Sequence, residues 1–362
     1  MGIFFRSAPI KAISSLRPAE QPLWYIPIRG AVSLARIFLR SALKMGRLID
    51  IAWPELQITV VAELADDDNP ELCEEFWQDL PFKVMQAHPV VSGESLYAWT
   101  PTISTAPVRL RRRIVDCAVG DLRYSQATGN KFSIQYGKGL EPLAQPVLGQ
   151  VRPEYHHLLP IVGKAIWNNL FFAKERIFVE VRPHDPAEAF NGQGRFGNLK
   201  GVAAEFYAEA KRIQTVEPED LRKIRTGQIG DTGTYGQFFT AWDFANGMLR
   251  DYIMYTAYPL LKLIDTLSHD DFVAAVEAFD PAYSEYLGYS GLNTLLDFSN
   301  KLRMAMKQTD DKEELKTLLR TFIMYGNRLC AWSYHYFPWY LGMFYGRAVN
   351  GQEFHGRFNP VQ

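Results

Sequence analysis

Residues 58–82 read ITVVAELADDDNPELCEEFWQDLPF, and this stretch decides the fold expected for the N-terminal half of the chain. Its first residues belong to a short run over 55–64 that is rich in β-branched side chains, which predicts a strand. Asn69 is a natural helix N-cap and Pro70 suits the first helical position. Apolar residues then recur at helical spacing up to Leu80, so a short helix with one buried face follows the strand.

More short strands are expected after this helix, and a long helical region follows them. The strands fall at 83–91, 95–100, 111–119, 122–126, 131–136 and 177–181. Many short strands with one early helix favour a small closed barrel. The helices fall at 199–214, 217–225, 235–267, 270–278, 282–307 and 311–345. The three residues expected to bend or interrupt them are Pro259, Gly288 and Pro338.

These patterns predict an α+β chain in which a β-barrel domain precedes an all-helical bundle domain. We expect an N-terminal extension over 1–50, a barrel over 51–182, a linker over 183–198 and a bundle over 199–362. A length of 362 residues fits two domains.

Composition limits the class of function. The chain is 47% hydrophobic and 22% charged, which is typical of globular proteins, and its net charge of −1 argues against nucleic acid as the main partner. Cys73, Cys117 and Cys330 are far apart and odd in number, which fits a reducing compartment. We therefore expect a cytoplasmic enzyme that acts on small molecules, and a homo-oligomer is possible.

The N-terminal extension contains an apolar stretch over 31–50 with the spacing of an amphipathic helix. Arg36, Arg40, Lys44 and Arg47 interrupt it too often for a membrane span. A helix packed on the protein is favoured, and a helix on a membrane surface is the alternative.

The loop between the second and third expected strands holds the first candidate for catalysis. Here His88, Ser92 and Glu94 lie within seven residues of sequence. An imidazole moves protons near neutral pH, and a carboxylate acts as a base or stabilises a developing positive charge. A polar hairpin with a capped turn is the alternative interpretation of the same residues.

Basic residues of the barrel half are the second candidate. They are Arg109, Arg111, Arg112, Arg113, Lys131, Lys138 and Lys164. Guanidinium groups pair with carboxylates through two hydrogen bonds, so such residues suit a dicarboxylate ligand. A solvated strand face is the simpler interpretation.

Two glycine-rich stretches and a histidine pair are weaker candidates. Residues 192–197 match G-x-G-x-x-G, but the nearest expected strand ends about ten residues earlier and no second parallel strand follows, so a linker is favoured over a dinucleotide site. Residues 231–237 precede a long expected helix, where they cap it or hold an anion. His156 and His157 are adjacent and point apart, so we expect no metal and no cofactor.

The opening stretch, with its strand, acidic loop, proline and Phe/Trp-bearing helix, resembles the cyclophilin-like superfamily. Prolyl isomerases carry an aromatic-His-Arg signature on the next strand, whereas this chain has KVMQAH at 83–88. The match is closer to a bacterial cyclophilin-like branch, through His88 with the Ser-Gly-Glu run at 92–94. A Gly-Asp-Leu turn at 120–122 and Tyr136-Gly137 continue the resemblance, which covers roughly 55–182.

A cyclophilin-like barrel followed by a helical bundle resembles the cucumopine and mikimopine synthases. The resemblance implies a Pictet–Spengler-type opine synthase that condenses L-histidine with 2-oxoglutarate and closes a new ring without a reductant or cofactor. For this chemistry we expect Glu94 to act as the base and His88 as its partner in proton transfer. The residues expected to bind or orient substrate are Ser92, Tyr97, Arg111, Tyr136, Lys138 and Lys164 from the barrel and Tyr235 from the bundle.

Two other functions compete with this one. A hydrolase of cyclic amides would use Glu94 to activate water. A non-catalytic scaffold would instead bind a partner through an exposed patch of the aromatic residues between Trp332 and Tyr340. Helical spacing favours packing of these aromatics in the core or at a dimer seam.

Overall fold

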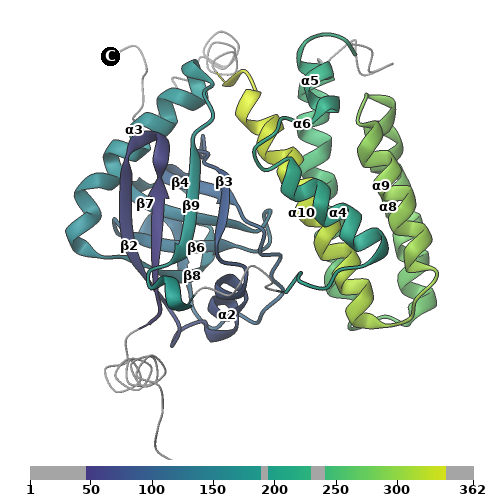
Figure 1. The fold of residues 1–362 in the computed structure, drawn as a ribbon, viewed down its shortest axis with the longest axis horizontal. Helices are drawn as coiled ribbons and strands as arrows, with labels where there is room; N and C mark the ends of the chain where they lie inside the picture. The colour runs from purple at the N-terminus through teal and green to yellow at the C-terminus, as the bar shows by residue number, and fades with distance from the viewer. Residues whose placement is uncertain (1–45, 189–194, 230–240, 340–362) are drawn as a thin grey trace, which may run out of the picture. The chain divides into compact units, whose positions relative to one another are not determined.

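The computed structural model describes residues 46–188, 195–229 and 241–339, and Figure 1 labels their helices and strands. The N-terminal half is an antiparallel sheet of nine strands within this part of the chain. The strands are β1 (Leu48–Trp53), β2 (Ile58–Leu64), β3 (Phe82–Met85), β4 (Gly93–Trp99), β5 (Arg111–Arg113), β6 (Asp121–Ser125), β7 (Lys131–Gly139), β8 (Ala144–Val151) and β9 (Phe178–Pro183).

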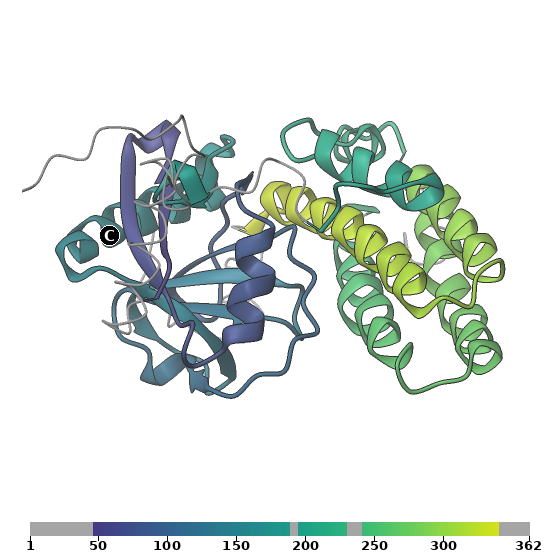
Figure 2. The same ribbon diagram turned by 60° about the horizontal axis from the view of Figure 1, so that its bottom comes forward.

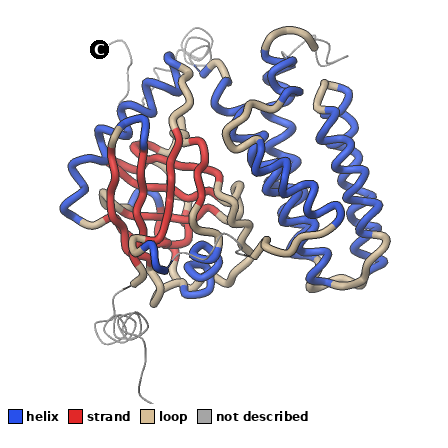
Figure 3. Tube along the Cα trace, viewed as in Figure 1, coloured by secondary structure: helices blue, strands red, loops and turns tan. Residues whose placement is uncertain are grey.

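The sheet closes on itself. Its strand order is β3-β9-β1-β2-β8-β6-β7-β4, with β5 paired to β8. Ala87 and Tyr97 exchange backbone hydrogen bonds of 2.9 and 3.0 Å, which join the segment after β3 to β4 at the other end of the order. The expected closed barrel is therefore confirmed, and Figure 3 shows its strands in red.

Two helices of the first half cover the barrel: α2 (Pro70–Gln78) and α3 (Leu159–Asn168). The apolar face expected for α2 is buried, and it packs into the same core as the inward-facing side chains of the strands. Short helical turns accompany them at η1 (Pro54–Leu56), η2 (Ile114–Asp116), η3 (Pro153–Leu158), η4 (Asn169–Ala173) and η5 (Pro186–Glu188).

The second half is helical throughout its described residues. Its elements are α4 (Gly201–Arg212), α5 (Glu219–Arg225), α6 (Ala241–Asp251), the π-helical η7 (Tyr252–Ala257), α7 (Tyr258–Leu263), α8 (His269–Tyr289), α9 (Asn293–Met306) and α10 (Lys312–Tyr336). The expected α+β order of a barrel and then a bundle is confirmed. None of the described helices combines the length and the apolar character that a membrane span requires.

Several expected boundaries are wrong. Residues 48–50, placed in a helix of the extension, begin strand β1, and the rest of that extension lies outside the described residues. The helix expected at 282–307 is divided at 290–292, because α8 runs through Pro281 to Tyr289 before α9 starts. Strand β8 and helix α3 were missed.

Asn69 does not cap α2 through its side chain, contrary to expectation. Its amide nitrogen donates to the carbonyls of Leu110 and Val147, at 2.9 and 2.7 Å, and its oxygen accepts from the backbone of Arg109 and Leu110. This buried side chain therefore holds the chain before β5 against β8, because it satisfies backbone groups that burial removes from water.

The barrel and the bundle share a second apolar core. It joins Tyr97 and Trp99 of β4 to residues of α4, α6 and α10. Tyr334 of α10 donates a 2.8 Å hydrogen bond to the His88 carbonyl, and Tyr258 of α7 donates one of 2.7 Å to the Ser104 carbonyl. Figure 2 shows α10 as the helix of the bundle that runs toward the barrel.

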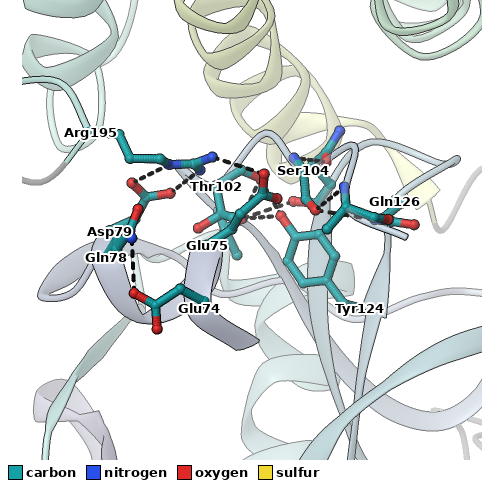
Figure 4. Close-up of polar contacts among 12 residues, drawn as sticks. Glu74, Glu75, Gln78, Asp79, Thr102, Ser104, Tyr124, Gln126 and Arg195 are labelled. Atoms are coloured by element: carbon teal, nitrogen blue, oxygen red, sulfur yellow. Dashed lines mark hydrogen bonds and ion pairs between the residues drawn. The ribbon is translucent and has the colours of Figure 1, made fainter. Parts of the chain in front are cut away.

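The described part of the glycine-rich stretch also ties the linker to the barrel. Figure 4 shows Arg195 paired with Asp79 and Glu75 at the end of α2, with nitrogen–oxygen distances of 2.6 and 3.3 Å. The Asp79 side chain is only 2% exposed. Arg195 therefore anchors this end of the stretch to the barrel.

Candidate functional site

A row of polar side chains lies on the outer face of the barrel. Residues alternate between the faces of a strand, so Leu96 and Ile134 enter the core while their neighbours point outward. The strand register pairs Ser95 with Gln135, Tyr97 with Ser133 and Trp99 with Lys131 across β4 and β7. Arg123 and Ser125 of β6 continue two of these rows on the other side of β7.

Helices of the bundle cover the β4 part of this face. The Tyr334 ring lies 5.6 Å from the ring of Tyr97 and 5.7 Å from that of Trp99, measured between centroids. Arg328, one turn and a half earlier on α10, donates a short hydrogen bond to the Trp99 carbonyl. The outer face of β4 is therefore an internal surface, where polar groups need partners from the protein or a ligand.

Three cations line this surface: Lys131, Arg250 of α6 and Arg328. We call the surface that they form the cationic face. Arg328 is 2% exposed, and its Nε and Nη1 atoms have no hydrogen-bond partner among the described residues. The Nε of Arg250 is likewise buried and unpartnered within the described ranges. No carboxylate of the described residues forms an ion pair with any of the three.

Burial lowers the pKa of two of these groups. Burial, aided by the charge of Arg250, lowers the pKa of Lys131 to about 7. Burial lowers the pKa of Arg328 to about 10. The cations also surround one residue of α10: burial raises the pKa of the Cys330 thiol to about 12, and the charges of all three oppose that rise. Such a group of uncompensated charges is complementary to an anion with more than one carboxylate.

A carboxylate that the sequence interpretation did not single out borders this face. Glu141, in the segment between β7 and β8, accepts a short hydrogen bond from the hydroxyl of Ser92. Its charge acts on Lys131 and on the buried Arg123, and it raises the pKa of both groups against the dominant effect of burial. Glu141 therefore connects the predicted Ser92 to the cationic face.

His88 is fully buried and hydrogen-bonded. Its Nε2 pairs with the Tyr136 hydroxyl at 2.8 Å and its Nδ1 with the Pro89 carbonyl at 2.7 Å. Burial lowers the pKa of its imidazole to about 4, so it is neutral at physiological pH. Its ring also contacts Trp167. The structure thus brings together two predicted residues, His88 and Tyr136.

Glu94 lies beside the same pair. One of its carboxylate oxygens accepts a 2.5 Å hydrogen bond from the backbone nitrogen of Lys138. Burial raises the pKa of Tyr136 and the charge of Glu94 raises it further. A Cβ on Gly137 would come within 2.4 Å of Glu94, so only glycine there allows the carboxylate this position. The side chain of Lys138 is exposed.

The other predicted residues are spread more widely. Arg111 is exposed on β5, which pairs with β8, and β6 and β7 separate β8 from β4. Lys164 is exposed on α3. Tyr97 lies on the outer face with Lys131, whereas Tyr235 lies outside the described residues.

The residues of the cationic face were largely missed from the sequence. Lys131 appeared only among the basic residues of the barrel half, and Arg250 and Arg328 did not appear at all. Arg328 carries a usable signal, because residues 321–335 are all buried and an arginine within such an apolar run is rarely left without a role. Trp332 and Tyr334 belong to the same buried run, which confirms core packing and contradicts the exposed patch of the scaffold alternative.

Comparison with known proteins supports an enzymatic interpretation of this architecture. Residues 199–336 match the family model of the cucumopine synthase C-terminal helical bundle domain. The solved structure of McbB in complex with tryptophan is similar, with a TM-score of 0.74 and 28% identity over 82% of this chain and 99% of that one. The search of curated proteins gave no match. Residues 199–336 therefore form a helical bundle domain of the cucumopine synthase family, and the chain as a whole is similar in fold to McbB.

Proposed function

We propose that this chain is a Pictet–Spengler-type opine synthase that condenses L-histidine with 2-oxoglutarate and closes a new ring without a reductant. The observation that carries the substrate class is the cationic face, whose three buried or half-buried cations have no carboxylate partner among the described residues. Both proposed substrates are carboxylates, and the oxo acid carries two. The family of the helical domain supports the reaction class.

Positioning of the two substrates is the main task that the reaction sets. Arg250 and Arg328 suit the carboxylates of the oxo acid, because guanidinium groups bind them through two directed hydrogen bonds. The rings of Tyr97, Trp99 and Tyr334 offer flat surfaces for the imidazole of the amino acid. Holding both reactants in line contributes roughly 7–11 kcal/mol to such a condensation.

A base must also remove the ring proton after the new carbon–carbon bond forms. The sequence analysis predicts Glu94 for this step, and that role stays a prediction. Glu141 competes for it, because its carboxylate is the one whose charge reaches Lys131 on the outer face. Each carboxylate has one hydrogen bond that fixes it, from Lys138 or from Ser92.

The direct test is mass spectrometry of the purified full chain incubated with L-histidine and 2-oxoglutarate and no cofactor. We expect a stable product whose mass equals both reactants minus one water. Because the neighbouring structure contains tryptophan, L-tryptophan is tested in parallel. Turnover of tryptophan in place of histidine would keep the reaction class and overturn the amino-acid assignment.

A variant pair links the reaction to the cationic face. Arg328→Met should raise the KM for 2-oxoglutarate roughly tenfold to a hundredfold, which corresponds to the loss of one charge-assisted hydrogen bond. Arg212→Met is the control, since Arg212 is an exposed arginine paired with Glu209 within α4. Equal effects of the two variants, or no product from any tested pair, would contradict the proposal and favour the cyclic-amide hydrolase.

A further inference from the structure

Lys131 lies at the start of β7 with its side chain on the outer face of the barrel. Its Nζ is 4.8 Å from the centroid of the Tyr97 ring and 5.3 Å from that of Trp99. Among the described residues it forms no ion pair, although the charge of Glu141 has a small effect on it. The amine therefore rests on aromatic faces instead of a carboxylate, and nothing in the described ranges neutralises it.

The titratable and charged groups around Lys131 come from α6, α10, β4 and the segment between β7 and β8. Arg250 of α6 adds a positive charge, whereas Cys330 of α10 and Glu141 act in the opposite direction. Tyr97 of β4 stays protonated, because burial raises its pKa well above the usual value. The balance, dominated by burial, gives Lys131 a pKa of about 7. A lysine that is desolvated and close to another cation is the kind that attacks carbonyl carbons.

Arg250 and Arg328 make this amine suitable for one class of carbonyl compound. The charges of Arg250, Arg328 and Lys131 all act on the thiol of Cys330 in α10, so the three groups lie near that residue. A 2-oxo acid that pairs one carboxylate with Arg250, whose charge acts on Lys131, would hold its carbonyl carbon near the amine, and Arg328 would remain for its second carboxylate. The positively charged groups also favour the anionic oxo acid over a neutral ketone.

We propose that Lys131 forms a covalent iminium with the carbonyl carbon of the 2-oxo acid, and that the amino-acid substrate then displaces it. This inference rests on the proposed function. The neutral Nζ attacks the carbonyl carbon and forms the C–N bond, and the carbonyl oxygen leaves as water after taking up protons. The amine of the amino acid next adds to the same carbon and releases Lys131 as the free amine. No atom is oxidised or reduced in this exchange.

The test is reductive trapping of the wild-type chain. The protein is incubated with 2-oxoglutarate and sodium cyanoborohydride, without any amino acid, and digested for peptide mass spectrometry. We expect an adduct on the peptide that contains Lys131, with the mass of the oxo acid minus water plus two hydrogens. Labelling should become faster as the pH is raised from about 6 to about 8, because the neutral amine is the nucleophile.

Lys262 of α7 provides the matched control, since its side chain is exposed and its Nζ also lies over an aromatic ring, 4.7 Å from the centroid of Tyr258. Lys131→Met should abolish the adduct, whereas Lys262→Met should leave it at the wild-type level. Lys131→Arg keeps the positive charge and should lose the adduct with its helical and near-ultraviolet circular dichroism unchanged, which separates loss of the amine from loss of the fold.

The outcomes distinguish this inference from the function on which it rests. Condensation product without any trapped Lys131 peptide would overturn the covalent step and leave the synthase proposal standing. If exposed lysines formed the adduct at the same rate as Lys131, the covalent step would also be overturned. A specific Lys131 adduct without condensation would support the inference and contradict the proposed reaction.

Discussion

Glu94 and Glu141 lie in segments that meet at one corner of the barrel, where Leu140 donates a backbone hydrogen bond to Ser92. At the scale of single residues the question is which of the two carboxylates transfers the proton. Glu94 lies close to Gly137 and its charge acts on Tyr136, whereas its hydrogen bond from the Lys138 backbone is exposed. Glu141 acts on Lys131 and Arg123, on the outer face.

We expect Glu94→Gln to lower kcat by about 10²- to 10⁴-fold, which is the usual contribution of a general base, with KM changed little. Glu141→Gln should leave kcat within roughly tenfold of wild type, because it weakens only the hydrogen bond from Ser92. Steady-state kinetics of both variants on the same substrates measures this. The reverse order of effects would assign the base to Glu141.

His88 provides a second prediction at this scale, because it is buried in its neutral form. Its pKa is lowered from 6.5 to about 4 in the folded chain. A lowered pKa means that its contribution to stability is present above pH 6.5 and is lost as the pH falls through 4. The full loss is on the order of 3 kcal/mol.

Urea unfolding between pH 7 and pH 4 should therefore show a steeper loss of stability for wild type than for His88→Asn. The exposed His157→Gln serves as the control and should follow wild type. His335 is also buried with a lowered pKa, so the variant should keep part of the slope. Parallel curves for wild type and His88→Asn would contradict the assignment of a neutral buried imidazole.

At the scale of elements, α3 lies against the barrel through a glycine. A Cβ on Gly163 would come within 2.4 Å of the Tyr136 ring. The ring is held by its hydrogen bond to His88, so it cannot move aside freely. The approach of α3 to β7 therefore depends on the missing side chain.

Gly163→Ala should lower the free energy of unfolding by about 1–3 kcal/mol through overpacking. Gly247→Ala in α6 is the matched helical substitution, since nothing lies within 4 Å of its Cβ position. That change should raise stability by roughly 0.5–1 kcal/mol, because alanine favours the helix. Chemical denaturation of both variants checks the pair, and the same sign for both would contradict this account of the α3 contact.

The wrong helix boundaries also belong to this scale. Pro281 lies inside α8, where the sequence alone favours a break, and the real interruption falls at 290–292. Gly291 there has a φ of +107°, a conformation that glycine adopts easily. Packing of α8 against α9 and η7 outweighs the local preference of proline, which is a common reason for errors in sequence-based helix limits.

At the scale of the whole molecule, the barrel and the bundle share an apolar core. We expect them to unfold in one transition, because neither half can bury that core alone. Far-ultraviolet circular dichroism of the helices and near-ultraviolet signals of the buried barrel residues Trp53 and Trp99 should give the same midpoint. Two separated midpoints would show that the halves are independent.

Tyr334→Phe tests the same coupling. It removes the hydroxyl that binds the His88 carbonyl and should cost about 1–3 kcal/mol, because a buried carbonyl then lacks its partner. Both circular dichroism signals should shift together. Tyr289→Phe is the control, since that tyrosine is 63% exposed, and its midpoint should equal that of wild type.

By itself the sequence determined the order of the fold: the strand and helix at 58–82, most of the other short strands and the helical second half. These depend on local spacing of apolar residues and on proline positions, which act over a few residues. The sequence also indicated the 88–94 loop as a candidate for catalysis and the basic residues of the barrel half as a candidate for binding carboxylates. Only the tertiary structure decided that Lys131, Arg250 and Arg328 share one surface. The register of β7 against β4 and the packing of α10 across that sheet bring them together, and neither can be derived from neighbours along the chain.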